Sequence, residues 1–168
     1  MIYLITGGER SGKSSYAQQL ALSLSTSPTY LATARKWDSS FEKRIERHQA
    51  ERGAQWKNLE VEKEIGSCAL DGEVVVIDCV TLWLTNYFTD SDGDVNLSLS
   101  LAKAEFEKIS AQNATLIFVT NEIGMGLHAT TPLGRMFVEL QGWMNQYIAS
   151  NANCVKFMVS GIPLTIKE

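Results

Sequence analysis

The stretch IYLITGGERSGKS, residues 2–14, joins a short apolar run to a glycine-rich loop that ends in a lysine and a serine. Its second part matches the pattern G-x-x-x-x-G-K-[ST], which binds phosphate where it follows a strand and opens a helix. Glycines let successive backbone N–H groups face one anion, and the positive end of the following helix adds to the attraction. The stretch therefore predicts a phosphate-binding loop made of Gly7, Gly8, Glu9, Arg10, Ser11, Gly12, Lys13 and Ser14.

Two side chains of this loop have distinct expected roles toward a nucleoside triphosphate. Lys13 would place its ammonium on the β- and γ-phosphates as a catalytic residue, and Ser14 would place its hydroxyl on Mg²⁺. The alternative is a glycine turn that matches the pattern by chance. The apolar run before the loop and the helical pattern after it argue against that alternative.

The rest of the chain alternates short apolar runs with longer segments of helical periodicity. We predict strands at residues 2–6, 29–33, 74–78, 115–120 and 154–160, and helices at 13–25, 41–51, 82–89, 97–112 and 133–150. Continuous apolar runs are typical of parallel strands that helices cover on both faces. The prediction is an α/β fold: a single P-loop NTPase-like domain over residues 1–168, with a mostly parallel sheet and an antiparallel edge strand at 164–167.

Composition narrows the possible functions. The chain has 168 residues and a net charge of −4, which fits one domain and disfavours nucleic-acid binding, because neutralising phosphates needs a basic surface. Its three cysteines form no C-x-x-C pair, so we expect neither a disulfide framework nor a zinc site. No apolar run approaches the roughly 18 residues that cross a bilayer. We therefore expect a cytoplasmic protein that does not insert into membranes.

Charge is concentrated in one part of the chain. Residues 35–64 hold eight Lys or Arg and seven Asp or Glu, and we expect a charged helical lobe there. Such a lobe is either a solvated, salt-bridged surface or a region that handles charged ligands. Within it, His48 shares a helix face with Ile45 and stands four residues from both Arg44 and Arg52. Spacing alone favours a hydrogen-bonded histidine at the edge of the core over a nucleophile whose phosphate target the arginines neutralise.

Two further strand ends carry polar side chains. Residues 74–77 are apolar and end in Asp78, an arrangement that places a carboxylate at the carboxyl edge of a parallel sheet, for Mg²⁺ or nucleotide, unless Asp78 only caps the next helix. Asn121 and Glu122 follow the strand at 115–120 and are expected at the same edge. For Glu122 the sequence leaves three alternatives open: a general base for a substrate hydroxyl, a contact to the substrate, or part of a polar turn.

Taken together, these segments resemble the bifunctional adenosylcobinamide kinase / adenosylcobinamide-phosphate guanylyltransferase family over nearly the whole chain. Besides the phosphate loop, the resemblance rests on YLATA at 30–34, RIERH at 44–48, DCVTLWLTN at 78–86, residues 119–126 and VSGI at 159–162. It implies that His48 becomes guanylylated, and so replaces the structural interpretation of His48 with a catalytic one. It also implies guanine-nucleotide contacts from the phosphate loop and from Ala32, Thr33, Ala34, Gln49, Ala50, Glu51, Arg52, Glu60 and Asp78.

The resemblance further implies two reactions on one scaffold and a homotrimer. ATP or GTP would phosphorylate adenosylcobinamide, with Lys13 and Mg²⁺ stabilising the group in transfer; the motifs above give Ser14 and Asp78 as the expected Mg²⁺ ligands. GMP from GTP would then pass through His48 to the adenosylcobinamide phosphate, giving adenosylcobinamide-GDP. Two alternatives remain open at this point: a monofunctional P-loop kinase of small molecules, and a nucleotide-switch protein.

Overall fold

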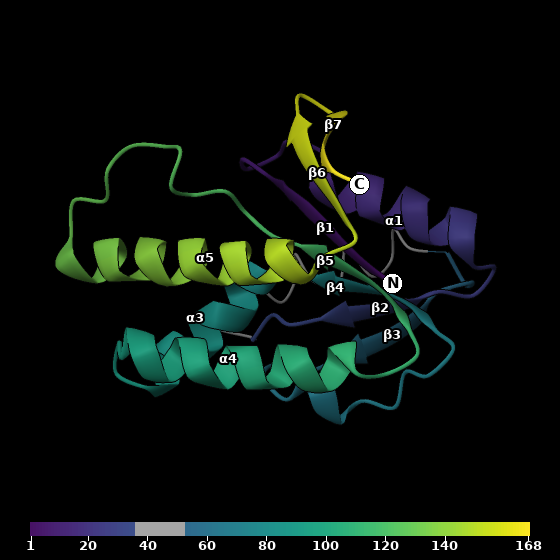
Figure 1. Ribbon diagram of the computed structural model, residues 1–168, viewed down its shortest axis with the longest axis horizontal. Helices are drawn as coiled ribbons and strands as arrows, with labels where there is room; N and C mark the ends of the chain where they lie inside the picture. The colour runs from purple at the N-terminus through teal and green to yellow at the C-terminus, as the bar shows by residue number, and fades with distance from the viewer. Residues whose placement is uncertain (36–52) are drawn as a thin grey trace.

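The computed structural model describes residues 1–35 and 53–168, which form one seven-stranded sheet in the order β3-β2-β4-β5-β1-β6-β7 (Figure 1). The strands are β1 Ile2–Gly7, β2 Thr29–Ala32, β3 Lys57–Glu60, β4 Val74–Asp78, β5 Thr115–Val119, β6 Cys154–Val159 and β7 Ile162–Lys167. All neighbouring pairs are parallel except β6 and β7. The helices are α1 Lys13–Leu24, α3 Val80–Asp90, α4 Val95–Ser110 and α5 Pro132–Asn151, with a short 3₁₀ turn, η1, at Ile65–Ser67.

The central strands are buried on both faces because helices cover each face of the sheet, and successive side chains point to opposite faces. On β4, Val75 and Ile77 belong to the larger apolar cluster, which α3, α4 and α5 complete. Val76, between them, belongs to the smaller cluster with Ala17 and Ala21 of α1. Those two alanines are four residues apart, so they form one stripe, and their small size lets α1 lie close to the sheet (Figure 1).

The predicted α/β class is therefore confirmed, with its parallel sheet and its antiparallel edge strand. The edge strand is longer than predicted, since β7 begins at Ile162 and pairs with β6. Strand β3 was not predicted. All four of its residues are exposed, and it pairs in parallel with β2 at the other edge of the sheet. The expectation of a helical lobe over 35–64 is thus wrong for Lys57–Glu60, and the helix predicted at 41–51 lies outside the described residues.

Two other observations bear on the expected class of protein. No helix within residues 1–35 and 53–168 is long and apolar enough to cross a membrane. All three cysteines, Cys68, Cys79 and Cys154, lie within the described residues and are free.

Candidate active site

The phosphate loop runs from the end of β1 to the start of α1, and two glycines allow its course. Gly7 has φ +151°, and a Cβ there would lie 2.6 Å from the carbonyl oxygen of Met158. Gly12 has φ +94° and precedes α1 as its N-cap, where a Cβ would lie 3.1 Å from Cα of Gly161. The Gly161 N–H also donates to the carbonyl of Ser11 at 2.9 Å. The loop is thus packed closely against β6 and the β6–β7 turn. A side chain at Gly7 or Gly12 would prevent this close approach.

Lys13 lies inside this loop. Its side chain is buried, and its ammonium donates to the Gly8 carbonyl at 2.5 Å. Burial lowers the pKa of Lys13, while the nearby charges of Asp78, Cys79 and Glu9 act in the opposite direction. The structure therefore brings Lys13 and Asp78 within electrostatic reach of each other, which agrees with the predicted position of Asp78 at the sheet edge that faces the phosphate loop.

Asp78 ends β4 at the carboxyl edge of the sheet. The Tyr30 hydroxyl donates to its Oδ2 at 2.8 Å. The alternative role of Asp78 as a helix cap is not realised, because α3 takes Cys79 as its N-cap and has no side-chain capping bond. Sheet register also places Asp78 beside Ala32, and Ala32 beside Glu60. Three of the predicted nucleotide contacts therefore stand level on adjacent strands β4, β2 and β3.

Thr33, by contrast, is fully buried directly after β2. Its hydroxyl donates to the Cys79 carbonyl at 2.8 Å, and its own carbonyl accepts from the Asn86 amide at 2.8 Å. These bonds hold the exit of β2 to the start and the body of α3. A direct contact from Thr33 to nucleotide stays a prediction, as does one from the half-buried Ala34.

The end of β5 meets the phosphate loop. The Glu122 N–H donates to the Gly7 carbonyl at 3.0 Å, so Glu122 lies at the same sheet edge, as predicted. Asn121 is engaged elsewhere, since its side-chain amide donates to the Thr81 hydroxyl at 3.2 Å. The remaining predicted site residues, His48, Gln49, Ala50, Glu51 and Arg52, lie outside the described residues.

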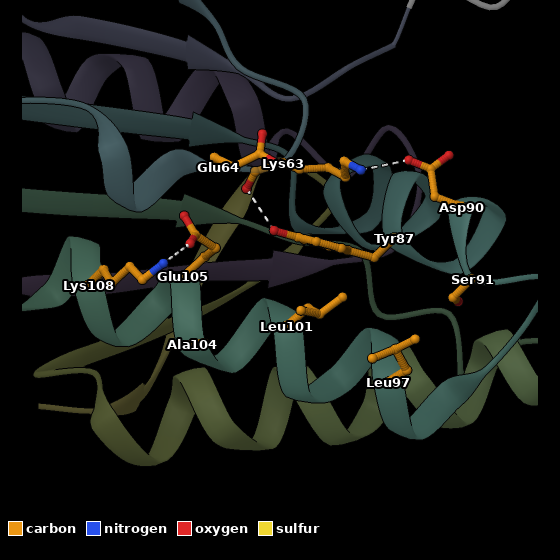
Figure 2. A pocket seen from close by; sticks show the side chains of 10 residues that line it. All are labelled: Lys63, Glu64, Tyr87, Asp90, Ser91, Leu97, Leu101, Ala104, Glu105 and Lys108. Carbon is orange, nitrogen blue, oxygen red and sulfur yellow. Dashed lines mark hydrogen bonds and ion pairs between the residues drawn. The ribbon is translucent and has the colours of Figure 1, made fainter.

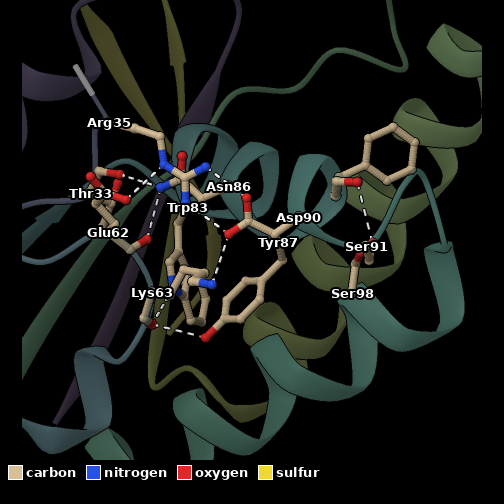
Figure 3. A network of polar contacts seen from close by, with 11 residues as sticks. Thr33, Arg35, Glu62, Lys63, Trp83, Asn86, Tyr87, Asp90, Ser91 and Ser98 are labelled. Carbon is tan, nitrogen blue, oxygen red and sulfur yellow. Dashed lines mark hydrogen bonds and ion pairs between the residues drawn. The ribbon is translucent and has the colours of Figure 1, made fainter. Parts of the chain in front are cut away.

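A group of charged residues connects the strand exits to α3 (Figure 3). Most of it comes from the segment 35–64, for which a salt-bridged surface is one of the two expectations, but the link to α3 was not predicted. We call Arg35, Glu62, Lys63 and Asp90 the α3 clamp. Arg35 donates to both oxygens of Asp90, at 2.7 and 2.9 Å, and to Glu62 at 2.7 Å. Lys63 donates to Asp90 at 2.8 Å. Hydrogen bonds from Arg35 and Lys63 hold the pKa of Asp90 well below its usual range.

Three uncharged side chains of α3 also donate hydrogen bonds to backbone carbonyls of the clamp residues. The Trp83 indole and the Tyr87 hydroxyl both donate to the Lys63 carbonyl, at 2.8 and 3.0 Å, and the Asn86 amide donates to the Glu62 carbonyl at 2.8 Å (Figure 3). Burial raises the pKa of Tyr87, which keeps it a donor at neutral pH. The chain leaving β2 and the chain leaving β3 are therefore fixed to one helix.

A cavity of about 300 Å³ lies beside the α3 clamp, and no residue of the phosphate loop lines it (Figure 2). Its one buried carboxylate, Glu105, accepts from the Gly66 N–H at 2.8 Å and from Lys108 at 2.6 Å. Its lining comprises Lys63, Glu64, Tyr87, Asp90, Ser91, Leu97, Leu101, Ala104, Glu105 and Lys108. None of the predicted site residues lines it, so we do not include it in the candidate active site.

Comparison with known proteins identifies the family. The model of the cobinamide kinase / cobinamide phosphate guanyltransferase family matches residues 3–166. The chain belongs to this family. It is 36% identical over 168 residues to the bifunctional adenosylcobalamin biosynthesis protein CobP of Pseudomonas aeruginosa, covering 98% of this chain and 96% of that protein. It is 35% identical over 182 residues to CobU of Escherichia coli, covering 99% and 100%.

The family resemblance inferred from the sequence is thereby confirmed, and with it the assignment as an enzyme. Among solved structures, the flagellar accessory protein FlaH from Methanocaldococcus jannaschii is similar with a TM-score of 0.48 and 14% identity, covering 99% of this chain and 77% of that one. We draw no functional conclusion from that likeness.

Proposed function

We propose that this member of the cobinamide kinase / cobinamide phosphate guanyltransferase family catalyses both reactions of its family. It transfers the γ-phosphoryl group of ATP or GTP to the hydroxyl of adenosylcobinamide, and then transfers GMP from GTP to the phosphorylated product, giving adenosylcobinamide-GDP. The observation that carries the proposal is the formed phosphate loop, with Lys13 buried inside it and in electrostatic reach of Asp78. The family match over residues 3–166 supplies the substrate class.

Lys13 and the backbone of the loop serve the phosphoryl transfer. Negative charge spreads over the γ-phosphoryl oxygens in the transition state, and a fixed cation there lowers the barrier. Burial strengthens this effect, because the charge of Lys13 is screened less by solvent than an exposed ammonium would be. Lys13 exchanges the neutral Gly8 carbonyl for phosphate oxygens, a stronger charge-assisted acceptor.

We propose that Ser14 and Asp78 hold Mg²⁺, since hydroxyl and carboxylate oxygens suit this hard cation. When bound, Mg²⁺ neutralises charge on the β- and γ-phosphate oxygens. Asp78→Asn keeps the shape of the side chain and loses its charge. We therefore expect the Mg²⁺ concentration that gives half-maximal kinase activity to rise at least about tenfold. Asp92→Asn, in an exposed turn, is the control and should titrate like the wild type. An unchanged Mg²⁺ requirement in Asp78→Asn would remove Asp78 from the metal site.

His48 carries the guanylyl transfer in this proposal. A nitrogen of the neutral imidazole attacks the α-phosphorus of GTP, so that an N–P bond forms and pyrophosphate leaves. An oxygen of adenosylcobinamide phosphate then attacks the same phosphorus and releases the histidine. Histidine suits both steps, because its neutral form is a nucleophile near pH 7 and its phosphoramidate stays reactive.

We also propose that the guanine nucleotide contacts the carboxyl edge of β2, β3 and β4. Supporting this, Glu60, Ala32 and Asp78 stand level on those three strands. Thr33 and Ala34 follow β2 at that edge, and the phosphate loop supplies the phosphate end. Gln49, Ala50, Glu51 and Arg52 are carried into the proposal by the family resemblance alone.

One incubation separates this function from its alternatives. The protein is mixed with adenosylcobinamide, GTP and Mg²⁺, and the corrinoid products are followed by mass spectrometry over time. We expect adenosylcobinamide phosphate first and adenosylcobinamide-GDP later. Phosphate product alone would indicate a monofunctional kinase. GTP hydrolysis without either product would indicate a nucleotide switch.

We further propose that the chain acts as a cytoplasmic homotrimer. Free cysteines are compatible with a reducing compartment. The edge strand β7 exposes the apolar side chains of Ile162, Leu164 and Ile166. An exposed apolar row on an edge strand is typical of a surface that another subunit covers. Light scattering coupled to size exclusion should give three times the 18.6 kDa chain mass. A monomeric mass at working concentration would contradict the trimer.

A further inference from the structure

A buried polar network fixes the chain where it leaves β5. Thr120 is fully buried, and its hydroxyl donates to Oδ1 of Asn145 at 2.7 Å. The Gln141 amide, also fully buried, donates to both of these oxygens at 2.9 Å. Asn145 in turn donates to the carbonyl of Asn121 at 3.1 Å. Buried polar groups hold their geometry tightly when they are bonded to one another, so α5 sets the position of residues 120–121.

Glu122 is the next residue, and the phosphate loop fixes its backbone through the 3.0 Å bond to Gly7. In the sheet, β5 lies between β1, which leads into that loop, and β4, which ends in Asp78. Glu122 therefore follows the strand that separates the two halves of the proposed nucleotide site. Its side chain is half-buried, and within residues 1–35 and 53–168 its carboxylate forms no hydrogen bond or ion pair.

The other carboxylates of this edge are already engaged. Asp78 accepts from Tyr30 and is proposed for Mg²⁺, while the charge of Glu9 interacts with the ammonium of Lys13. Glu60 is exposed on the outermost strand, β3. A hydroxyl acceptor beside the phosphate loop therefore has Glu122 as the carboxylate best placed to take its proton.

We propose that Glu122 is the general base of the phosphoryl transfer, an inference that rests on the kinase step proposed above. The acceptor hydroxyl oxygen forms a bond to the γ-phosphorus, and the bond from that phosphorus to the β–γ bridging oxygen breaks. The bridging oxygen keeps the electron pair and leaves with the nucleoside diphosphate. The hydroxyl proton moves to the Glu122 carboxylate and from there to water.

The segment after Glu122 also exposes apolar side chains beside the proposed base. Met125, which stands between Gly124 and Gly126, is 74% exposed, and Leu127 is fully exposed. These two side chains follow Glu122 closely along the same loop. Exposed apolar side chains beside a polar reacting group are typical of a surface that receives an amphipathic substrate. The acceptor would lie on this segment with its hydroxyl toward Glu122.

The test measures the two reactions separately in single-turnover rapid-quench experiments. Transfer from γ-labelled GTP to adenosylcobinamide reports the kinase step, and incorporation of α-label from GTP into protein reports guanylylation. For Glu122→Gln we expect phosphoryl transfer to slow about 100-fold, within the usual range for losing a general base, while guanylylation stays within about twofold of wild type. Glu122→Asp, which keeps a carboxylate, should fall between. Glu139→Gln, an exposed glutamate on α5, is the matched control and should leave both rates unchanged.

Two results would overturn the assignment of Glu122. Phosphoryl transfer at the wild-type rate in Glu122→Gln would exclude a general base there, and an equal fall of both rates would assign Glu122 a purely structural role. Retained guanylylation also shows that the variant is folded. If the wild type itself formed no adenosylcobinamide phosphate, the proposed function would fail together with this inference. If the wild type formed it and Glu122→Gln formed it at the same rate, only the inference would fail.

Discussion

The phosphate loop and the α3 clamp both form where strands leave the sheet, and they are built in opposite ways. The loop consists of contiguous residues whose course depends on backbone conformation, with Gly7 and Gly12 at positive φ. The clamp consists of charged side chains from three separate segments, joined by ion pairs between Arg35, Lys63 and Asp90. A site coded by neighbouring residues is visible in the sequence, whereas one assembled from distant residues becomes visible only in the folded chain.

The phosphate loop and the α3 clamp also differ in how their charges are paired. Lys13 is buried in the loop, and its ammonium bonds a neutral carbonyl, so its charge is available to an anionic ligand. In the clamp, each charge is matched by an opposite one within 2.9 Å. The loop is thus suited to bind phosphate, and the clamp to hold chain segments together.

The largest effect that separates the two regions is expected from Lys13→Ala. Removing the buried cation takes away transition-state charge stabilisation, and we expect phosphoryl transfer to fall about 10³-fold with weaker triphosphate binding. Lys57→Ala, which removes an exposed ion pair with Glu73, should leave the kinase rate near wild type. Single-turnover transfer and nucleotide titration measure both variants. Near-normal turnover in Lys13→Ala would refute the phosphate-loop assignment.

A second, smaller effect concerns the backbone of the loop. Gly12→Ala places a Cβ 3.1 Å from Gly161 at φ +94°, so we expect a loss of about 1–2 kcal/mol in the free energy of unfolding. Gly142→Ala, in the middle of α5 with open space around its Cβ position, should instead add up to about 1 kcal/mol. Urea unfolding compares the two. Equal effects of the same sign would show that the loop conformation is not constrained as described.

Much of the fold and part of the site could be predicted, because local patterns carry them. The loop, the position of Asp78 and the edge location of Glu122 all follow from short motifs placed after apolar runs. Strand β3 could not be found this way, because Lys57–Glu60 is an exposed edge strand with no apolar run. The link to α3 has no local signature either: Arg35 meets Asp90 only because the chain that leaves β2 passes the end of α3 in the fold.

The smallest effect is expected at the clamp, and it depends on pH. Ion pairing lowers the pKa of Asp90 in the folded state, so the pair stabilises the protein above the ordinary carboxyl pKa of about 4 and ceases to do so as pH falls through the lowered value. Asp90→Asn has no such stabilisation to lose. We therefore expect the wild type to have the higher urea midpoint at pH 7, and the difference to shrink as the pH is lowered below about 4.

Asp92→Asn is the matched control, because Asp92 is exposed in the neighbouring turn and has no ion pair within the described part of the chain. It should unfold like the wild type at each pH. A difference between wild type and Asp90→Asn that does not change with pH would mean that the charge of Asp90 contributes nothing to the clamp.

We propose that one chain carries two separable reactions, with Lys13 serving phosphoryl transfer and His48 serving guanylyl transfer. The most direct measurement is a parallel incubation of wild type and His48→Asn with α-labelled and γ-labelled GTP in the presence of adenosylcobinamide. We predict that His48→Asn incorporates no α-label into protein yet still forms adenosylcobinamide phosphate, and that the wild-type adduct is labile in acid and stable in base, as a phosphoramidate is. Persistent α-label on the variant would place the nucleophile elsewhere, and loss of both reactions in a folded variant would contradict their separation.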